Sequence, residues 1–394
     1  MPGSVIISSA RTPIGKLSGS LATLPATDLG GHAIAAALAR AGITGEQVDY
    51  VLMGQVLQAG AGQMPARQAA VKGGVPMSVP SMTVNKVCLS GIDAIYLADQ
   101  MINAGDAEIV VAGGMESMTR APYLLPNARE GYRMDHGQLV DSMIGDGLWC
   151  AFDAVHMGAG TERYAGEMGG ITREMQDEFA AQSHERAAAA IKAGRLAEEI
   201  EPIEIPQRRG DPVLVDTDEG VRPGTTAESL SKLRPAFSPD GTITAGNASQ
   251  ISDGAAAVVV TSPENAERLG VAPLAELMSY GMVAGPDPSL LTQPSRAIVR
   301  ALDKMGKQVG DLELIEINEA FAAVAIASMR DLGIDDTIVN VNGGAIALGH
   351  PIGASGTRVV LTLVDELRRR GGELGAASLC GGGGQGEAVV VRAL

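Results

Sequence analysis

Two segments near opposite ends of the chain share one order of elements, and this repeat constrains the fold more than any single motif. Residues 34–40 form an apolar helical stretch that stops at Gly42, and the apolar run 50–53 follows. Residues 298–304 stop at Gly306 in the same way, and the run 312–317 follows. A glycine after the last helical turn is a common stop signal. The match predicts an internal duplication, with chance likeness between two α/β segments as the alternative.

The two segments also continue alike. A glycine-containing turn enters a second helix at residues 88–92 and again at residues 353–357, and apolar runs follow at 109–112 and 387–391. Strands that alternate with helices favour an α/β fold whose sheet is largely parallel and covered on both faces. We therefore predict two related α/β halves.

The middle of the chain, residues 120–246, differs from both ends. It holds Trp149, the only tryptophan, and much of it alternates proline, glycine and charged residues. One helix is predicted over residues 172–193, with Thr172 as its N-cap and Gly194 past its end. We interpret the rest as a loop-rich insertion, and such insertions often carry binding residues.

Composition narrows the class of protein. A chain of 394 residues predicts about two or three domains. The net charge of −16 argues against nucleic acid and anionic membrane as partners. No run approaches the roughly 20 apolar residues of a membrane span, and the start has no signal-peptide pattern. Three cysteines and five unclustered histidines predict a reducing cytoplasm, no disulfide framework and no metal site.

Cys88 stands where an apolar run that ends near Asn85 meets a helical pattern that begins near Leu89. A thiol at a helix start has a lowered pKa, because the helix dipole and free N–H groups favour the thiolate. The same N–H groups can stabilise an oxyanion on an attached thioester. We therefore predict a nucleophile, with a buried structural cysteine as the alternative.

A histidine and an asparagine occupy two further predicted corners. His350 lies between a glycine and Pro351, which predicts a rigidly held imidazole able to take a proton from a thiol and return it. Asn318 ends a predicted strand and precedes a helix that begins near Ala320, where a carboxamide can hold a water or an oxyanion. The alternatives are a hydrogen-bonded loop histidine and a plain helix cap.

Cys380 follows the apolar run 376–379 and precedes four consecutive glycines. Consecutive glycines form helices and strands unfavourably, so we predict a turn whose backbone N–H groups approach a ligand closely. Cys380 can remove an acidic C–H proton where the resulting oxyanion is stabilised. A small buried residue before a flexible turn is the alternative.

The motifs at residues 85–91, 318–321, 349–356 and 380–386 resemble, in this order, those of the thiolase family. The resemblance covers essentially the whole chain, including residues 11–15. It implies a duplicated five-layered αβαβα core, with residues 1–119 and 248–270 in one half and 271–394 in the other. It also implies an inserted loop domain, residues 120–247, that binds coenzyme A and contributes to a tetramer built as a dimer of dimers.

The resemblance further implies a mechanism on acyl-coenzyme A thioesters. Cys88 would be acylated after activation by His350, and Cys380 would remove the α-proton of a second acetyl group. One oxyanion hole would consist of His350 and a water held on Asn318. The other would consist of the N–H groups of Cys88 and Gly382. Coenzyme A is then substrate and product, and no cofactor is expected.

By resemblance, ten further residues would contact the substrate: Leu148, His156, Met157, Arg222, Ser229, Phe237, Ala245, Ser249, Ala320 and Phe321. Arg222 would supply a favourable charge near the nucleotide. Its surroundings, residues 201–235, hold five basic and seven acidic residues, so the linear charge pattern reveals no phosphate site. We expect either that folding gathers the basic residues, which include Arg208, or that the phosphates stay in solvent.

Three positions depart from the family pattern or match no role in it. Leu89 stands where a small residue is usual, which predicts crowding beside the nucleophile. Residues 293–296 depart from the usual Gly-Pro-x-Pro-Ala run, so the resemblance assigns no contacts there. Cys150 matches no catalytic position, and we interpret it as structural.

Three functions remain open at this point. The first is condensation of two acetyl thioesters, which Met157 beside His156 favours because it resembles the short-chain class. The second is cleavage of longer 3-ketoacyl thioesters by the same residues. The third is a catalytically silent scaffold, which the presence of both Cys380 and His350 disfavours. A decarboxylating ketoacyl synthase is also disfavoured, because those relatives have His or Asn in place of Cys380.

Overall fold

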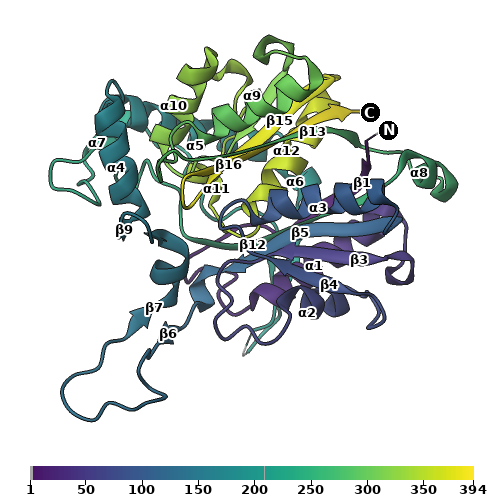
Figure 1. The fold of residues 1–394 in the computed structure, drawn as a ribbon, viewed down its shortest axis with the longest axis horizontal. Helices are drawn as coiled ribbons and strands as arrows, with labels where there is room; N and C mark the ends of the chain where they lie inside the picture. Colours follow the sequence, from purple (N-terminus) through teal and green to yellow (C-terminus); the bar gives the residue numbers. More distant parts are fainter. Residues whose placement is uncertain (1–2, 208) are drawn as a thin grey trace.

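The computed structural model describes residues 3–207 and 209–394, and its large sheet repeats one strand order twice. The order is β4–β3–β5–β12–β1 in the first half and β14–β15–β16–β13 in the second (Figure 1). The first set is β4 (Ser81–Val84), β3 (Tyr50–Gly54), β5 (Ile109–Ser117), β12 (Ser252–Thr261) and β1 (Val5–Arg11). The second set is β14 (Leu314–Ile317), β15 (Leu374–Gly381), β16 (Gln385–Ala393) and β13 (Ala275–Ala284). An isolated parallel bridge between Ile315 and Val339 takes the place of a β4 equivalent.

The sheet is mixed, so the prediction of a largely parallel sheet is wrong. Parallel pairing is found for β3 with β4, β3 with β5 and β14 with β15. In each half a later strand, β12 or β16, returns antiparallel between two others. The halves meet where β1 pairs with β13 at only two positions, Val5 with Glu276 and Ile6 with Ala275.

Helices cover both faces of each half and produce five layers (Figure 1). The outer helices of the first half bury Ile34 and Ala69 against its strands. The central pair buries Ile95 and Val360 between the two halves. The outer helices of the second half bury Ile298 and pack Met329 against its strands. These pairs are α1 (Ala26–Ala41) with α2 (Pro65–Lys72), α3 (Ser90–Ala104) with α12 (Ser355–Arg370), and α9 (Gln293–Met305) with α10 (Ala322–Leu332).

The helix ends confirm the repeat that the sequence predicted. α1 stops at Gly42 and α9 stops at Gly306, each in the left-handed conformation with φ of 67° and 64°. Each glycine N–H donates to a carbonyl of the last turn, which satisfies groups that the helix itself leaves open. The strands β3 and β14 follow, as expected.

The middle of the chain contains more helix than the sequence indicated. The predicted helix is α5 (Arg173–Lys192), and the Thr172 hydroxyl accepts the Met175 N–H at 3.3 Å as a cap. A second helix, α4 (Met157–Met168), was not predicted. The shorter elements are β6 (Tyr123–Leu124), β7 (Val140–Asp141), a π-helical turn (Met143–Leu148), β8 (Trp149–Cys150), β9 (Val155–His156), α6 (Arg195–Glu199), β10 (Ile203–Ile205), β11 (Val213–Val215) and α7 (Ala227–Ser231). Outside this segment lie β2 (Gly15–Lys16), α8 (Pro263–Leu269) and α11 (Ala345–Leu348).

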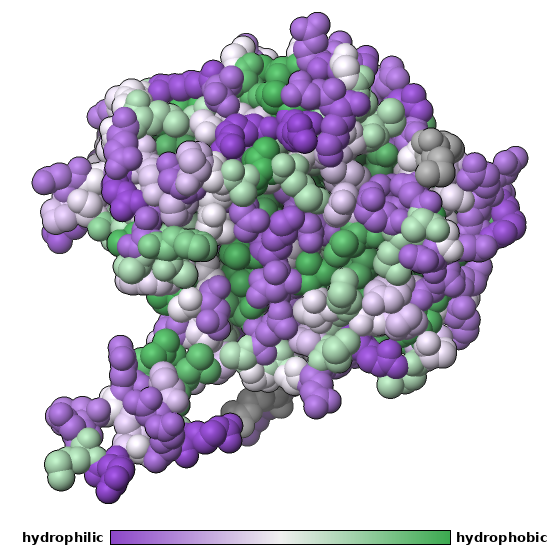
Figure 2. Space-filling model, viewed as in Figure 1, coloured by the Kyte–Doolittle hydropathy of each residue, from purple (hydrophilic) through white to green (hydrophobic). Residues whose placement is uncertain are grey.

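An arm formed by β6, β7 and the loop between them projects from the body of the protein (Figures 1 and 2). Several of its apolar side chains are exposed, and Met134 is 91% exposed. Within the described ranges, no helix combines the length and apolar character that crossing a membrane requires. Among the same residues, no three His, Cys, Asp or Glu side chains gather as a metal site.

Candidate active site

Cys88 lies on a tight corner between the end of β4 and the start of α3. Val87 before it has φ of 52°, in the left-handed region that β-branched residues rarely adopt. Such a conformation costs about 1–3 kcal/mol and persists only where the surroundings hold it. Here the Val87 N–H donates to Asn85 Oδ1 at 3.1 Å, and the Ser90 hydroxyl donates to the Val87 carbonyl at 2.6 Å. The corner therefore fixes the direction of the Cys88 thiol.

The expectation of a low pKa for Cys88 is wrong for the free protein. Burial raises the pKa of the Cys88 thiol to about 12, although N–H groups of Cys88 and Gly382 oppose the change. Removing a thiolate from water is costly, and here that cost exceeds what the helix start contributes. Cys88 at rest is thus a neutral thiol that needs a base.

Cys380 lies inside a strand and not in a glycine turn. β15 continues through Cys380 and Gly381, which pair with Gly386 and Gln385 of β16, and the turn begins at Gly382. The prediction of a turn directly after Cys380 therefore fails by one residue, because ladder hydrogen bonds override the low strand propensity of glycine. Cys380 is fully buried.

The β15–β16 hairpin lies directly against the Cys88 corner. A Cβ added at Gly381 would lie 2.6 Å from Leu89 Cγ, and one at Gly382 would lie 3.4 Å from Val87 Cγ1. Burial raises the pKa of the Cys380 thiol, and the charge of Cys88 raises it further. The N–H of Gly382, two residues after Cys380, also interacts with Cys88, so the two cysteines lie on segments that adjoin each other.

His350 lies in the loop between α11 and α12 and is held from both ring nitrogens. Its Nδ1 lies 2.6 Å from Ser355 Oγ, and that hydroxyl donates to the Pro351 carbonyl. Nδ1 therefore carries the proton, and Nε2 accepts from Asn318 Nδ2 at 3.4 Å. Burial, followed by the positive charge of Arg358, lowers the His350 pKa to about 3. At neutral pH the ring is a neutral base.

Asn318 connects the histidine to the Cys380 strand. It directly follows β14, and its N–H donates to the Ser378 carbonyl at 3.0 Å, two residues before Cys380. Its side chain is fully buried, and Oδ1 has no hydrogen-bond partner among the described residues. A buried acceptor without a partner costs about 1–3 kcal/mol. Asn318 thus presents an acceptor that a polar group of a substrate or a water can satisfy.

Most of the predicted substrate contacts pack beside these groups. Met157, Phe237, Ala320 and Phe321 belong to, or pack on, the apolar cluster that contains Cys380. The rings of Phe237 and His156 lie 4.9 Å apart, and those of Phe237 and Phe321 lie 6.3 Å apart.

Two further predicted contacts reach the site through the backbone and a second cluster. Leu148 packs on the apolar cluster that Cys88 also contacts, which contains Val56, Leu57 and Ile352. The Ser249 N–H donates to the Ala320 carbonyl at 3.1 Å.

The remaining predicted contacts lie on the surface. Arg222, Ser229 and Ala245 are exposed, and their described contacts do not join them to the thiols. The Arg222 N–H donates to His184 Nδ1 at 3.1 Å. The Ser229 hydroxyl donates to the carbonyl of Thr226, the N-cap residue of α7. Arg208 lies outside the described residues. The roles of these residues stay predictions.

Comparison with known proteins agrees with this geometry. Residues 4–264 match the family description "Thiolase, N-terminal domain", and residues 271–393 match "Thiolase, C-terminal domain". The chain belongs to the thiolase family. A "Probable acetyl-CoA acetyltransferase" of Mycolicibacterium smegmatis is 57% identical over 98% of this chain and 100% of the relative.

A second sequence relative and a solved structure show the same likeness. The "Acetyl-CoA acetyltransferase" of Cupriavidus necator is 56% identical over 98% of both chains. The crystal structure of the Bacillus anthracis acetyl-CoA acetyltransferase has a TM-score of 0.97 and 40% identity, covering 100% of this chain and 99% of that one. The α/β fold of this chain is therefore the thiolase fold.

The departures from the thiolase pattern have structural explanations. Leu89 is fully buried in the core between the halves and packs on Gly381, so its side chain is part of the core and not of an open pocket. The segment at residues 293–296 starts α9, where the Gln293 carbonyl closely approaches Gly386 of the hairpin. Cys150 is 4% exposed and accepts the Asp153 N–H at 3.4 Å, as expected of a structural cysteine.

One residue that orients the thiolase histidine was not assigned that role from the sequence. Ser355 fixes the tautomer of His350, although it sits five positions later in the chain. The only available signal was its place in the motif Gly-His-Pro-Ile-Gly-Ala-Ser, since the loop conformation that brings the two together is not encoded in spacing alone.

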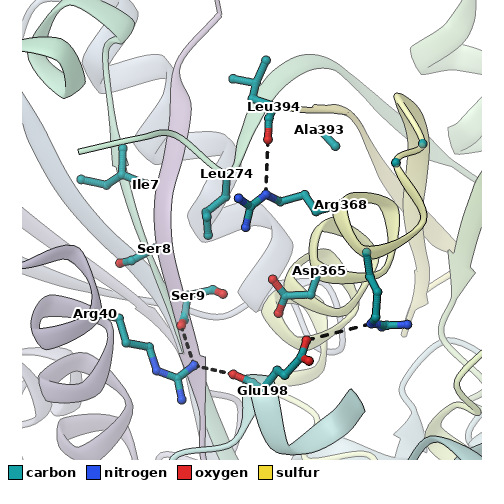
Figure 3. Close-up of a pocket in the computed structure, with 13 residues that line it drawn as sticks. Ile7, Ser8, Ser9, Arg40, Glu198, Leu274, Asp365, Arg368, Ala393 and Leu394 are labelled. Atoms are coloured by element: carbon teal, nitrogen blue, oxygen red, sulfur yellow. Dashed lines mark hydrogen bonds and ion pairs between the residues drawn. The ribbon is translucent and has the colours of Figure 1, made fainter. Parts of the chain in front are cut away.

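A cavity of about 760 Å³ lies away from the predicted site (Figure 3). Arg368 and Arg369 line it from the last turn of α12, whereas His350 precedes the first turn, and 16 helical residues span roughly 24 Å. Arg40 in this cavity donates to the Ser9 and Glu198 carbonyls, and Arg368 donates to the Leu394 carbonyl. None of the predicted site residues lines it.

Proposed function

We propose that this thiolase is an acetyl-CoA C-acetyltransferase that joins two acetyl-CoA molecules reversibly into acetoacetyl-CoA and free CoA. One observation carries the proposal above all others: the β15–β16 hairpin, whose first strand bears the buried Cys380, packs with Gly381 and Gly382 against the corner that bears the half-buried Cys88. The relatives cited above, which match over nearly the full chain, carry the same activity in their names.

In the first step, Cys88 is acetylated. The neutral imidazole of His350 takes the thiol proton on Nε2 as the sulfur attacks the thioester carbon. The bond from that carbon to the CoA sulfur then breaks, and CoA leaves with a proton. The high pKa of Cys88 explains why a base is required.

In the second step, the Cys380 thiol gives its proton to the neutral imidazole of His350, and the Cys380 thiolate removes the α-proton of a second acetyl-CoA. The carbanion attacks the acetyl carbon on Cys88, a carbon–carbon bond forms, and the Cys88 sulfur leaves and regains a proton. Two oxyanions develop, one on each thioester. The N–H groups of Cys88 and Gly382 suit one of them, and protonated His350 with a water on Asn318 Oδ1 suits the other. All of these groups belong to the protein, with CoA as substrate and product.

Substrate binding follows the aromatic cluster. We assign the pantetheine and thioester contacts to Leu148, His156, Met157, Phe237, Ser249, Ala320 and Phe321. The exposed residues Arg222, Ser229 and Ala245 are assigned to the nucleotide end, where phosphates stay partly in solvent. Lys232 in this region forms an ion pair with Glu228 at 3.4 Å, so its charge is already partly neutralised within the protein.

The assembly and location are also proposals. We propose a homotetramer in the cytoplasm, with residues 1–119 and 248–270, 120–247, and 271–394 as the three parts of the chain. The exposed apolar residues of the projecting arm, which include Tyr123, Leu125 and Leu139, support a contact between subunits. All three cysteines are free, which supports a reducing compartment.

The test combines a labelled intermediate with a chain-length series. Incubation with acetyl-CoA labelled in the acetyl group should place the label on the peptide that contains Cys88, as read by mass spectrometry. Cleavage rates should be higher for a C4 than for a C8 3-ketoacyl-CoA. A label on another residue would refute the assignment, and faster turnover of C8 would favour the alternative, a degradative thiolase for longer chains.

A further inference from the structure

The proposed reaction gives no role to Glu116, although this carboxylate is fully buried near the site. It lies in β5, and all three of its described hydrogen bonds come from backbone N–H groups. The N–H groups of Val56 and Gly353 donate to Oε2, both at 3.0 Å, and the Leu57 N–H donates to Oε1 at 3.2 Å.

These three donors belong to two different loops. Val56 and Leu57 follow β3 and belong to the apolar cluster that Cys88 contacts. Gly353 comes three residues after His350 and belongs to the other half of the molecule. One carboxylate therefore joins the loop beside the thiol to the loop that carries the imidazole.

The backbone around Gly353 leaves no room for the two loops to slide. A Cβ at Gly353 would lie 2.9 Å from Glu116 Oε2, and one at Gly114 would lie 2.0 Å from the Gly353 carbonyl oxygen. Contacts of this kind allow neither a larger side chain nor an intervening water. Gly91, at the start of α3, would meet the same carbonyl at 3.1 Å.

We propose that Glu116 is a positioning residue, which holds the His350 loop against the Cys88 loop at the separation that proton transfer from the thiol requires. This inference rests on the proposed function. Proton transfer and attack depend steeply on distance, and a displacement of about 1 Å can cost roughly 100-fold in rate.

The charge of Glu116 gives the inference a second consequence. Burial raises the pKa of Glu116 to about 7, with an added contribution from Asp253 on the neighbouring strand β12. Cys88 and Asp253 are the titratable groups whose charges interact with it. Its negative charge also raises the pKa of Cys88, and so opposes thiolate formation before substrate arrives.

Glu116→Gln in the full chain separates these two effects. Glutamine keeps the size of the side chain, but one oxygen becomes an NH2 group that cannot accept a backbone N–H. We expect kcat for condensation to fall about 10- to 100-fold with little change in KM, because Glu116 does not touch substrate. Alkylation of Cys88 by iodoacetamide at pH 8 should become about three- to tenfold faster, because the opposing charge is gone.

Asp49→Asn is the matched control. The Asp49 carboxylate also accepts two backbone N–H groups, from Glu108 and Ile109, but at the opposite end of β5. The seven residue steps from Ile109 to Glu116 separate the two carboxylates by roughly 23 Å along the strand. This variant should change neither kcat nor the alkylation rate of Cys88.

The inference is overturned if Glu116→Gln keeps the kcat of the unaltered protein, or if its kcat loss equals the loss of acetylatable Cys88 in the sample. The second result would indicate misfolding of a fraction of molecules and no positioning role. The alkylation assay requires no acetyl-CoA, so its result judges Glu116 separately from the proposed function. If the unaltered protein and Glu116→Gln condense acetyl-CoA at the same rate, the inference about Glu116 is wrong and the proposed function still holds.

Discussion

The two halves of this thiolase share a strand order but place different chemistry at equivalent corners. In the first half, the corner between β4 and α3 carries Cys88. In the second half, the corner that precedes α12 carries His350. α3 and α12 pack together in the central layer, so the two corners meet. Duplication supplies two converging backbones, and in the proposed mechanism the residues that differ between them supply a nucleophile on one side and a base on the other.

The halves differ again at the strand that follows. β5 leads into the inserted middle segment before β12 closes the sheet, whereas β15 turns directly into β16 through three glycines. The long connection in the first half carries residues that we assign to substrate contacts, such as Met157 and Phe237. The short one in the second half packs Gly381 and Gly382 against Leu89 and Val87, the two residues that flank Cys88. Under the proposed function, equivalent positions in a duplicated fold serve binding in one copy and chemistry in the other.

The sharpest way to test this division is to replace each thiol alone. Cys88→Ser should abolish both acetyl transfer to the protein and condensation, with a loss on the order of 10⁶-fold for removal of a nucleophile. Cys380→Ser should retain acetylation of Cys88 and lose about 10²- to 10⁴-fold in condensation only, because a general base acts only in the second step. Single-turnover acetylation measured by mass spectrometry, beside steady-state condensation, separates the two.

If Cys380→Ser lost both steps equally, the halves would not have separate roles. Cys150→Ser is the control, since this third thiol is buried, accepts the Asp153 N–H and has no part in either step, so the exchange should leave both steps within about twofold.

A second prediction compares how the two thiols ionise. Both have raised pKa values, so each stays neutral at pH 7, and thiolate forms only as the pH rises toward the raised value. Alkylation of Cys88 should therefore increase about tenfold per pH unit from pH 7 to 9.5, roughly 300-fold in all, with no plateau. Cys380, which is fully buried, should react more slowly at every pH. Peptide mapping after timed iodoacetamide treatment measures both rates.

A plateau for Cys88 below pH 9 would contradict this prediction. It would mean that the start of α3 lowers the thiol pKa more than burial raises it, and the expectation from sequence alone would hold.

The smallest predicted effect concerns the contact between the hairpin and the Cys88 corner. Gly381→Ala should destabilise the protein by about 1–3 kcal/mol, because the added methyl would meet Leu89, which is fully buried and cannot move aside. Gly310→Ala, where nothing lies within 4 Å of the added methyl, should change stability by less than about 0.5 kcal/mol. Denaturant unfolding of the two variants gives both values. Equal values for the two variants would show that the hairpin is not tightly packed on the corner.

The sequence was most informative where a local rule decides the structure. Gly42 and Gly306 end their helices because only a residue without a side chain easily adopts the left-handed conformation, and Thr172 caps α5 for an equally local reason. The duplication was visible through these signals. The antiparallel return of β12 and β16 was not, because strand direction depends on which distant segments pair.

The site shows the same division between local and distant causes. The motifs that contain Cys88, Asn318, His350 and Cys380 were recognisable, and the corner before α3 was expected. The pKa of Cys88 was predicted in the wrong direction, because burial by the hairpin comes from residues almost 300 positions away. Glu116 gave only a weak signal, a single acid at the end of an apolar strand, since the N–H groups that it binds lie in two separate loops.

The positive φ of Val87 has a consequence for how this enzyme can be improved. Glycine or asparagine would adopt that backbone conformation at lower cost, so selection for heat resistance alone should favour either one at this position. The same substitution would leave the direction of the Cys88 thiol less fixed, so the turnover rate would fall as the thermal stability rose. Engineers who seek a robust biocatalyst therefore gain more by leaving this corner intact and reinforcing the molecule elsewhere.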